Sequence, residues 1–268
     1  CTVLTAHIDM VCFTSEGAGS YLDWTLQVDG QTNVFPSTGY GEPFISSING
    51  VNFSIASGVS VGSGGVVDFE GENFGPAFDL VDEVTFGPTG TEFYLYDSAD
   101  SSANAYGSCS LVVAHTKLRC TVPPGIGKGH LVMVSVGGQR TSTATAEASQ
   151  RLNYTAPNIS SVFPPRGVTT GGYEVTLTGS DFGTSSDDLE VLFWGTLIAA
   201  EDVVFTSSRE ITFVVPEGQG SAHSVEVFHA SDVCTESCKL GSNKANFSYF
   251  DPIVDRIIVS LVENKTDW

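Results

Sequence analysis

The residues best suited to chemistry in this sequence are its cysteines, which fall into three close pairs. The pairs are Cys1 with Cys12, Cys109 with Cys120, and Cys234 with Cys238. In the first two pairs, ten residues separate the cysteines, which can face each other across a turn on antiparallel strands at the Cα separation that a disulfide needs. Zinc binding is the alternative, but no Cys-x-x-Cys is present. We therefore expect three disulfides and an oxidising compartment rather than a metal site or free thiols.

One serine lies in a pattern that some hydrolases use for a nucleophile. Gly58-Val-Ser60-Val-Gly62 matches Gly-x-Ser-x-Gly, which exposes the serine only when a strand precedes it and a helix follows it. Here a strand-like run, Val66 to Phe69, follows instead. We expect no catalytic residue at this position and no enzymatic activity in the chain.

Glycine-rich loops could in principle bind phosphate. Gly125-Ile-Gly127-Lys-Gly129 has such a composition, but no helix follows it to bind an anion. It aligns with Gly17-Ala-Gly19 and Gly218-Gln-Gly220, so the sequence predicts a recurrent hairpin turn and no phosphate cofactor.

Histidines and acidic residues supply no clear metal-ligand spacing. We expect His7 and His115 to be turn residues, because both recur at the middle of a cysteine-bounded segment. Oxygen-rich clusters could bind Ca²⁺, although no Asp-x-Asp-x-Asp loop is present, and a solvated acidic surface is the favoured interpretation. We therefore predict no metal. The remaining histidines are His130, His223 and His229, and the acidic clusters are Asp79 to Glu83, Asp187 to Glu190, and Glu201-Asp202.

Asparagine gives a second indication of compartment. Five of the ten asparagines lie in Asn-x-Ser/Thr sequons without proline, where chance would give about two. Serine- and threonine-rich β-proteins also generate such sequons freely, so the excess supports secretion without requiring that every site is used. The predicted N-glycosylation sites are Asn52, Asn153, Asn158, Asn246 and Asn264.

Charge and hydropathy narrow the range of partners. The 268 residues contain 11 basic and 31 acidic side chains, giving a formal net charge of −20, which disfavours nucleic acid and anionic membrane surfaces. No run reaches the roughly 18 apolar residues of a spanning helix. The chain opens on Cys1 without a leader, so we expect it to be a slice of a longer protein whose membrane contact, if any, lies outside this sequence.

The elements that would position these residues are short strands. In the run from Tyr173 to Thr178, apolar and polar residues alternate with the period of a half-buried strand, and no capped stretch has a helical period. Strands at this spacing with Gly and Pro turns predict β-sandwiches. Further predicted strands are Val84 to Gly87, Leu131 to Val136, Val191 to Gly195, Ile211 to Val215 and Val225 to Phe228.

Two internal repeats set the domain organisation. The segment from Cys1 to Cys12 recurs 108 residues later at Cys109 to Cys120, and Tyr-x-x-Pro followed by spaced apolar residues occurs at Pro43, Pro157 and Pro252. Proline suits a handover between domains because it lacks a backbone donor and favours an extended residue before it. The predicted domains are the C-terminal part of one repeat (1–42), two complete repeats (43–156 and 157–251) and the first strand of another (252–268).

The repeated motifs resemble the IPT/TIG domain, an immunoglobulin-like sandwich. The resemblance lies in Pro157-NISSVFPPRGVTTGGYEVTLTGSDFG, Val191-LFWG, Ile211-TFVVPEGQG and Phe247-SYFDP, and the middle repeat follows it through Pro43-FISSI and Ser63-GGVVDFEGENFG. The family occurs in plexins, scatter-factor receptors, fibrocystin-like proteins and large surface proteins of algae and protists. The resemblance implies an all-β fold of tandem immunoglobulin-like sandwiches in an elongated array.

Three functions are compatible with such an array. The favoured one is a structural and interaction segment of a large extracellular or cell-surface glycoprotein: an adhesin, a receptor ectodomain, or a subunit of an extracellular filament or appendage. Its partners would be other domains of the same array, or an extracellular protein or glycan. The alternative is a noncatalytic accessory region of a secreted carbohydrate-active enzyme, with an aromatic platform formed from Tyr94, Tyr96, Trp194 or Trp24. A Rel-like DNA-binding domain is disfavoured by the charge and by the predicted disulfides.

Overall fold

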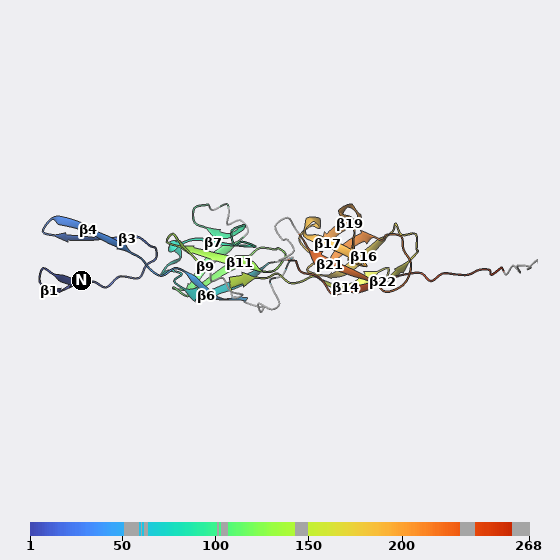
Figure 1. Ribbon diagram of the computed structural model, residues 1–268, viewed down its shortest axis with the longest axis horizontal. Coiled ribbons are helices and arrows are strands. Elements are labelled where there is room, and N and C mark those ends of the chain that lie inside the picture. Colours follow the sequence, from blue (N-terminus) through green and yellow to red (C-terminus); the bar gives the residue numbers. More distant parts are fainter. Residues whose placement is uncertain are drawn as a thin grey trace, which may run out of the picture.

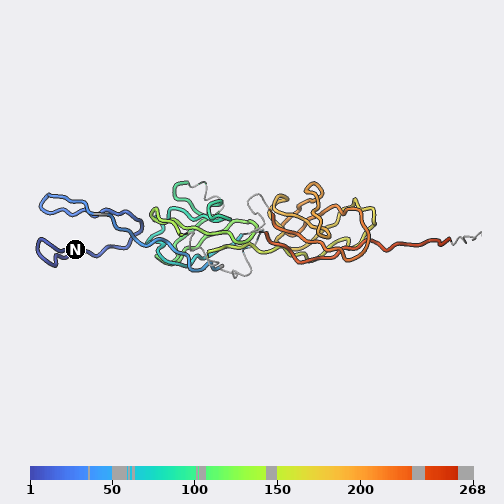
Figure 2. Tube along the Cα trace, in the orientation of Figure 1, coloured from blue at the N-terminus to red at the C-terminus, as the bar shows by residue number. Residues whose placement is uncertain are grey.

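The computed structural model arranges the chain along one long axis, with two hairpins together at one end, followed by two β-sandwiches and an extended segment (Figure 1). The Cα trace shows this elongated array from end to end (Figure 2). No helix among the described residues is long and apolar enough to cross a membrane. The structure describes residues 1–50, 59, 61, 64–100, 102, 107–142, 150–230 and 239–258.

The first sandwich consists of two antiparallel sheets. One sheet has the order β5-β6-β10-β9, and the other has the order β12-β11-β7-β8 with β13 also paired to β11. The strands are β5 (Phe44–Gly50), β6 (Gly65–Glu72), β7 (Val81–Gly87), β8 (Phe93–Asp97), β9 (Ser108–Val113), β10 (Lys117–Val122), β11 (His130–Val136), β12 (Gln139–Arg140) and β13 (Arg151–Leu152).

The second sandwich repeats this plan. Its sheets have the orders β14-β16-β20-β19 and β15-β22-β21-β17-β18, with β15 lying parallel to β22 at the edge. The strands are β14 (Asn158–Phe163), β15 (Arg166–Gly167), β16 (Glu174–Ser180), β17 (Leu189–Phe193), β18 (Thr196–Leu197), β19 (Val203–Ser207), β20 (Glu210–Val214), β21 (His223–His229) and β22 (Ala245–Tyr249).

Each sandwich has its own apolar core, formed by the inward side chains of both sheets. In β16 the alternation seen in the sequence places Val175 and Leu177 inside and leaves Glu174 and Thr178 exposed. The two clusters of buried residues run from Ile45 to Tyr154 and from Ile159 to Tyr249. Alternate side chains of each strand point either into solvent or into the space between the two sheets. Each sandwich therefore forms its core from its own residues, without residues of the neighbouring sandwich.

The first 42 residues form two hairpins that extend away from the first sandwich (Figure 1). They contain β1 (Thr2–Thr5) with β2 (Asp9–Val11), and β3 (Leu22–Val28) with β4 (Gln31–Thr38). Trp24 and Leu26 of β3 are half-buried while their neighbours are exposed. Trp24 and Leu26 lie on the same face of β3, because alternate side chains of a strand share a face, and this is the pattern of a strand that packs one face against another sheet.

Two predicted elements differ from the structure. The strand predicted from Val191 to Gly195 ends at Phe193, because Trp194 (φ 51°) and Gly195 (φ 78°) adopt left-handed conformations and turn the chain back into β18. The loop from Gly125 to Gly129 is not a hairpin turn. It connects β10 to β11, and these strands pair in different sheets.

Candidate functional site: the junctions between repeats

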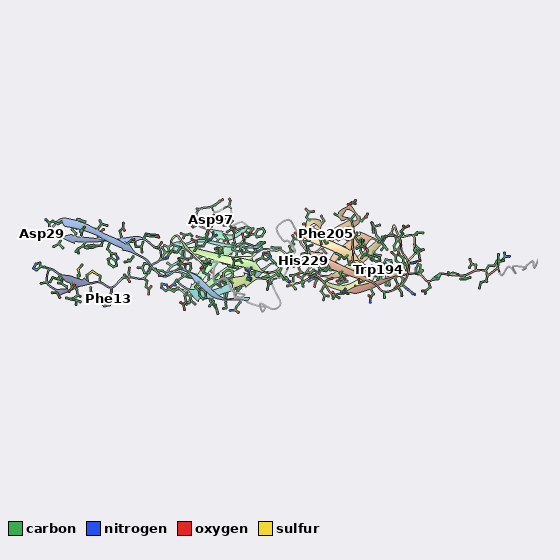
Figure 3. The ribbon with its side chains drawn as sticks, in the orientation of Figure 1. Phe13, Asp29, Asp97, Trp194, Phe205 and His229 are labelled. Atoms are coloured by element: carbon green, nitrogen blue, oxygen red, sulfur yellow. A yellow bond between two sulfur atoms is a disulfide. The ribbon has the colours of Figure 1, made fainter. Side chains whose placement is uncertain are left out.

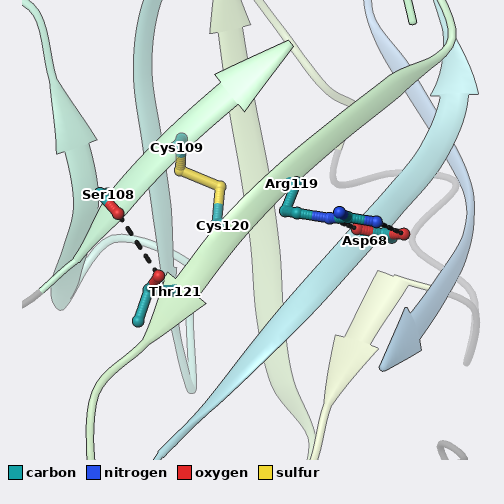
Figure 4. The surroundings of a disulfide bond; sticks show 6 residues. All are labelled: Asp68, Ser108, Cys109, Arg119, Cys120 and Thr121. Atoms are coloured by element: carbon teal, nitrogen blue, oxygen red, sulfur yellow. Dashed lines mark hydrogen bonds and ion pairs between the residues drawn. A yellow bond between two sulfur atoms is a disulfide. The ribbon is translucent and has the colours of Figure 1, made fainter. Parts of the chain in front are cut away.

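Two of the predicted cysteine pairs are joined. Cys1 is bonded to Cys12, and Cys109 is bonded to Cys120 with a Cα–Cα distance of 4.1 Å. Cys109 and Cys120 are directly opposite each other on β9 and β10, which is the arrangement their spacing predicts (Figure 4). Cys234 and Cys238 lie outside the described residues, so their pairing remains a prediction.

An ion pair lies beside the second disulfide on the same sheet. Arg119 on β10 donates from Nε and Nη2 to the two carboxylate oxygens of Asp68 on β6, at 2.6 and 2.9 Å (Figure 4). This charge-assisted pair lowers the pKa of Asp68. Together with the disulfide, it links three adjacent strands of the sheet.

A tyrosine at the end of each repeat is held by the glycine loop of the same repeat. The tyrosine N–H donates to the carbonyl of the second glycine, and its hydroxyl donates to a carbonyl just before that loop. The backbone bonds are Tyr40 N to Gly19 O, Tyr154 N to Gly127 O and Tyr249 N to Gly220 O, at 2.9, 2.8 and 2.9 Å. The hydroxyl acceptors are Ser15 O, Pro123 O and Pro216 O.

Only glycine fits the first position of each loop, because the tyrosine ring occupies the space of a side chain. A Cβ on Gly17, Gly125 or Gly218 would come within 2.8, 2.6 or 2.6 Å of the ring. We call this arrangement of glycine loop and tyrosine the tyrosine clamp. It fixes the point where the chain leaves one repeat and enters the next.

At the first junction, a side chain of the first sandwich binds the preceding tyrosine clamp. Gln139 accepts from the N–H of Gly19 through Oε1 at 3.1 Å and donates through Nε2 to Tyr40 O at 3.1 Å. Asn73, which has a left-handed backbone (φ 63°), donates from Nδ2 to the carbonyl of Glu42 at 2.9 Å. These bonds attach the hairpins to the sandwich in addition to the short covalent connection between Tyr40 and Pro43.

At the second junction, His229 takes the place of the glutamine. Its Nδ1 accepts from the N–H of Gly127 at 3.4 Å, and its Nε2 is 2.7 Å from the carbonyl of Asp181. Asp181 is left-handed like Asn73 (φ 58°), and its Oδ1 accepts from the N–H of Val61 at 3.2 Å. In Figure 3 the labelled His229 lies where the two sandwiches meet.

The partners of His229 determine its protonation. A carbonyl can only accept, so Nε2 carries the hydrogen, and Nδ1 must stay unprotonated to accept from Gly127. The side chain is fully buried, and this burial lowers the pKa of His229 against the smaller opposing effects of Asp181 and Asp188. The neutral imidazole is thus the form that joins the two sandwiches.

A pocket next to the second junction is shared by both sandwiches. The first sandwich contributes most of its wall, and the turn before β17 contributes the rest. Asp188 in that turn caps it by accepting from the N–H groups of Thr184 and Ser185 at 2.8 and 3.0 Å. We call this surface the proximal pocket; it is lined by Phe86, Phe93, Pro123, Pro124, Gly125, Ile126, His130 and Tyr154, with Thr184 and Asp188 from the second sandwich.

The other predicted residues that the structure describes do not come together as a catalytic or metal site. Gly58, Ser60, Gly62, Asn52 and Asn264 lie outside the described residues. Among the residues that the structure describes, no group of three His, Cys, Asp or Glu side chains could hold a metal ion. His7 and His115 are left-handed residues at the tips of their hairpins, as the sequence predicts. His130 and His223 are buried and bond to backbone carbonyls at 2.7 and 2.8 Å.

Several of the described acidic residues bond to neighbouring side chains or backbone groups. Asp82 accepts from Ser135 and from the N–H of Gly138, and Glu83 pairs with Arg140 at 3.0 Å. Glu190 pairs with Lys239 at 3.0 Å. Asp82, Glu83 and Glu190 thus bind nearby donors within the fold.

The candidate aromatic platform is divided among three places. Trp24 lies in the second hairpin, Tyr94 and Tyr96 on β8 of the first sandwich, and Trp194 at the far end of the second sandwich. The three predicted sequons within the described residues also have different surroundings. Asn158 and Asn246 are exposed, whereas Asn153 is half-buried and accepts from the N–H of Gly129 at 2.6 Å.

Comparison with known proteins agrees with this fold. Residues 157–249 match the sequence model of the IPT/TIG domain family, so this part of the chain is an IPT/TIG domain, as the resemblance indicated. Fibrocystin-L of Mus musculus is 37% identical over 79 residues, which is 28% of this chain and 2% of that protein. The chain thus corresponds to a very small part of this curated relative.

Two solved structures resemble the chain at low similarity. The extracellular region of plexin A4 has a TM-score of 0.30 and 19% identity, over 78% of this chain and 18% of that chain. The surface glycan-binding protein PbSGBP-B from Prevotella bryantii has a TM-score of 0.38 and 16% identity, over 76% of this chain and 42% of that chain.

Proposed function

We propose that this chain is a stiff interaction segment of a large extracellular or cell-surface glycoprotein. In this proposal, tandem IPT/TIG sandwiches form a rod that holds partner-binding loops and strand edges at fixed spacings. An adhesin, a receptor ectodomain and a filament or appendage subunit would each use such a rod. The disulfides and the exposed sequons at Asn158 and Asn246 support the extracellular setting.

One observation supports the proposal: the same arrangement of hydrogen bonds connects the repeats at both junctions. In each, a tyrosine clamp leaves the N–H of its second glycine pointing forward, and a side chain of the next sandwich accepts from it. A second link comes from the left-handed residue of the next sandwich, Asn73 or Asp181. Domains joined in one chain move relative to each other by default, and in this proposal two separate links at each short connection restrict both bending and rotation between repeats.

The mechanism is mechanical rather than catalytic. Each sandwich buries its own core, so the repeats can stack without exchanging core residues. The junction bonds then set the direction of the next repeat. Exposed strand edges and loops along the rod are available for protein partners, since an edge strand presents unpaired backbone groups.

The stiffness can be tested by small-angle X-ray scattering of the full chain. We expect the intact chain to scatter as a rod. Inserting Gly-Ser-Gly-Ser between Thr155 and Ala156 should shorten the mean end-to-end distance and add the scattering of a flexible joint, because the second junction would then be free to open. If the intact chain already scattered like the chain with the insertion, the proposal of a stiff segment would be wrong.

A further inference from the structure

The end of the second sandwich carries a pocket built around the same tyrosine and histidine positions as the proximal pocket. The equivalence rests on matching bonds: Tyr154 and Tyr249 donate to Pro123 O and Pro216 O, and His130 and His223 bond to Ile126 O and Gln219 O. We call this surface the distal pocket; it includes Phe193, Trp194, Leu197, Asp202, Pro216, Glu217, Gly218, Gln219, His223 and Tyr249.

The two pockets differ in what covers them. The proximal pocket is completed by Thr184 and Asp188 of the following sandwich. The distal pocket is lined only by residues of its own sandwich, and there Trp194 and Leu197 are 70% and 56% exposed. Figure 3 shows Trp194 at the end of the second sandwich that faces the extended segment. An apolar surface that is covered in one repeat is therefore open in the next.

The glycine N–H of the third tyrosine clamp is also unused. Gly19 and Gly127 donate to Gln139 and His229 of the following sandwich. Among the residues that the structure describes, no side chain or backbone oxygen accepts from the N–H of Gly220. This donor lies beside the distal pocket, at the position that both earlier junctions use.

The segment that follows the distal pocket has the residue pattern of the strand that opens each sandwich, but its apolar residues are exposed. After Pro252, Val254 and Ile257 are 70% and 80% exposed. The residues at the corresponding distance from the earlier prolines are buried: Ile45 after Pro43 is 0% exposed and Ile159 after Pro157 is 4% exposed. Exposed apolar residues in this register match the strand that opens each preceding sandwich.

We propose that the distal pocket is the docking surface for a further IPT/TIG sandwich whose first strand is residues 253–258. This inference rests on the proposed function. The incoming sandwich supplies a side chain, Gln or neutral His, that accepts a hydrogen bond from the N–H of Gly220. Its turn corresponding to the one before β17, which contributes Thr184 and Asp188 to the proximal pocket, covers Trp194, Leu197 and Tyr249.

The charges of the distal pocket restrict that turn. Asp188 and Pro124 both line the proximal pocket, whereas Glu217 takes the sequence position of Pro124 in the distal pocket, which Asp202 also lines. A carboxylate at the position of Asp188 would meet like charges there. The natural occupant therefore carries an uncharged or basic residue at that position.

The test replaces residues 253–268 with a second copy of the second sandwich, so that β14 of the copy takes the place of residues 253–258. Residues 158–251 are joined again after Pro252, and the copy carries Ser221→Thr so that peptides spanning Gly220 in the two sandwiches differ in mass. Exposed Ser221 makes this change without touching the core. Hydrogen exchange is then followed by mass spectrometry at Gly220 of the original sandwich, with and without Glu217→Pro, which reproduces the proximal pocket.

With Glu217→Pro, we expect the appended copy to slow exchange of the peptide that contains Gly220 at least tenfold. With Glu217 kept, the slowing should be smaller and should increase in 0.5 M salt; equal slowing in both would overturn the charge restriction. In the copy, His229→Ala should abolish the slowing and His229→Gln should keep it. The alanine substitution could unfold the copy. The proposal is therefore judged on the slowing of exchange seen with the glutamine variant and with the unchanged copy.

No slowing in any version would overturn the docking surface. Protection at Gly127 is measured in the same samples, and it separates the two proposals: if Gly127 stays protected while Gly220 does not, only the docking inference fails, whereas loss of both would remove the stiff segment itself. Cellohexaose is added to the unextended chain as a second probe. If it slowed exchange around Trp194 and Gly220, the distal pocket would be a glycan site instead.

Discussion

The imidazole of His229 accepts a hydrogen bond from the backbone N–H of Gly127, which lies in the other sandwich 102 residues earlier in the chain. The same ring bonds through Nε2 to Asp181 of its own sandwich. One neutral side chain thus connects the glycine loop of one repeat to the left-handed corner of the next.

Replacing His229 with alanine should loosen the second junction. The N–H of Gly127 and the carbonyl of Asp181 would each lose a partner, which costs about 1–3 kcal/mol for a buried group. His229→Gln should retain most of the connection, because Gln139 makes the corresponding bonds at the first junction. Hydrogen exchange at Gly127 measures the effect. Equal protection in the alanine and glutamine variants would contradict the role given to His229.

Acidification should weaken the same junction. Burial lowers the pKa of His229 below its unfolded value of about 6.5, so the unfolded or opened state binds the proton more readily. Stability from the neutral form is therefore complete above about pH 6.5, falls as the pH drops below it, and levels off below the folded pKa. Exchange at Gly127, corrected for its intrinsic pH dependence, should show this loss.

The control for this pH effect is His229→Gln, which removes the titrating group. Burial also lowers the pKa of His130, so overall unfolding will retain some pH dependence in the control. Exchange at Gly127 in the glutamine variant should nevertheless be flat from pH 7 to 5. A decline equal to that of the wild type would show that His229 is not the group whose protonation loosens the junction.

Removing the hydroxyl of a clamp tyrosine should destabilise its own repeat. Tyr154→Phe removes the bond to Pro123 O and leaves that carbonyl without this donor, at a cost of about 1 kcal/mol. Tyr249→Phe is the matched change in the second sandwich, where the acceptor is Pro216 O. Chemical denaturation of each variant should show similar losses. No change in either would mean that the ring alone holds the loop.

The disulfide between Cys109 and Cys120 should stabilise the first sandwich. Replacing both with alanine should lower its free energy of unfolding by about 2–3 kcal/mol, measured by hydrogen exchange of the β11 amides. The matched control is the replacement of Cys1 and Cys12, whose hairpin extends away from that sandwich. The control should leave β11 exchange unchanged. A similar loss in the control would show that the hairpins support the sandwich core.

Glycosylation should favour the exposed sequons. Asn158 and Asn246 are open to solvent, while the side chain of Asn153 is half-buried against Gly129, so expression in a eukaryotic secretory host should modify the first two most fully. Mass spectrometry of tryptic glycopeptides measures the occupancy of each site. Bare asparagine at both Asn158 and Asn246 would weaken the extracellular assignment considerably.

The sequence determined the parts of this protein that depend on local pattern. Alternation in segments such as Tyr173 to Thr178 predicted the strands and their buried faces, because side chains on a strand alternate between its two sides. The spacing of Cys109 and Cys120 predicted a cross-strand pair, and the repeated motifs around Pro157 indicated the IPT/TIG fold. Each of these inferences needs only residues that are close together in the chain.

Only the tertiary structure decided what the glycine loops and His229 do. The loop at Gly125 was predicted to be a hairpin turn, but its two flanking strands pair with partners that are far away in the sequence and belong to different sheets. His229 has no motif that distinguishes it from any buried histidine, and its acceptor role depends on where a backbone N–H from another repeat comes to lie. Stacking one sandwich on the next creates that contact, and no periodicity within either repeat encodes it.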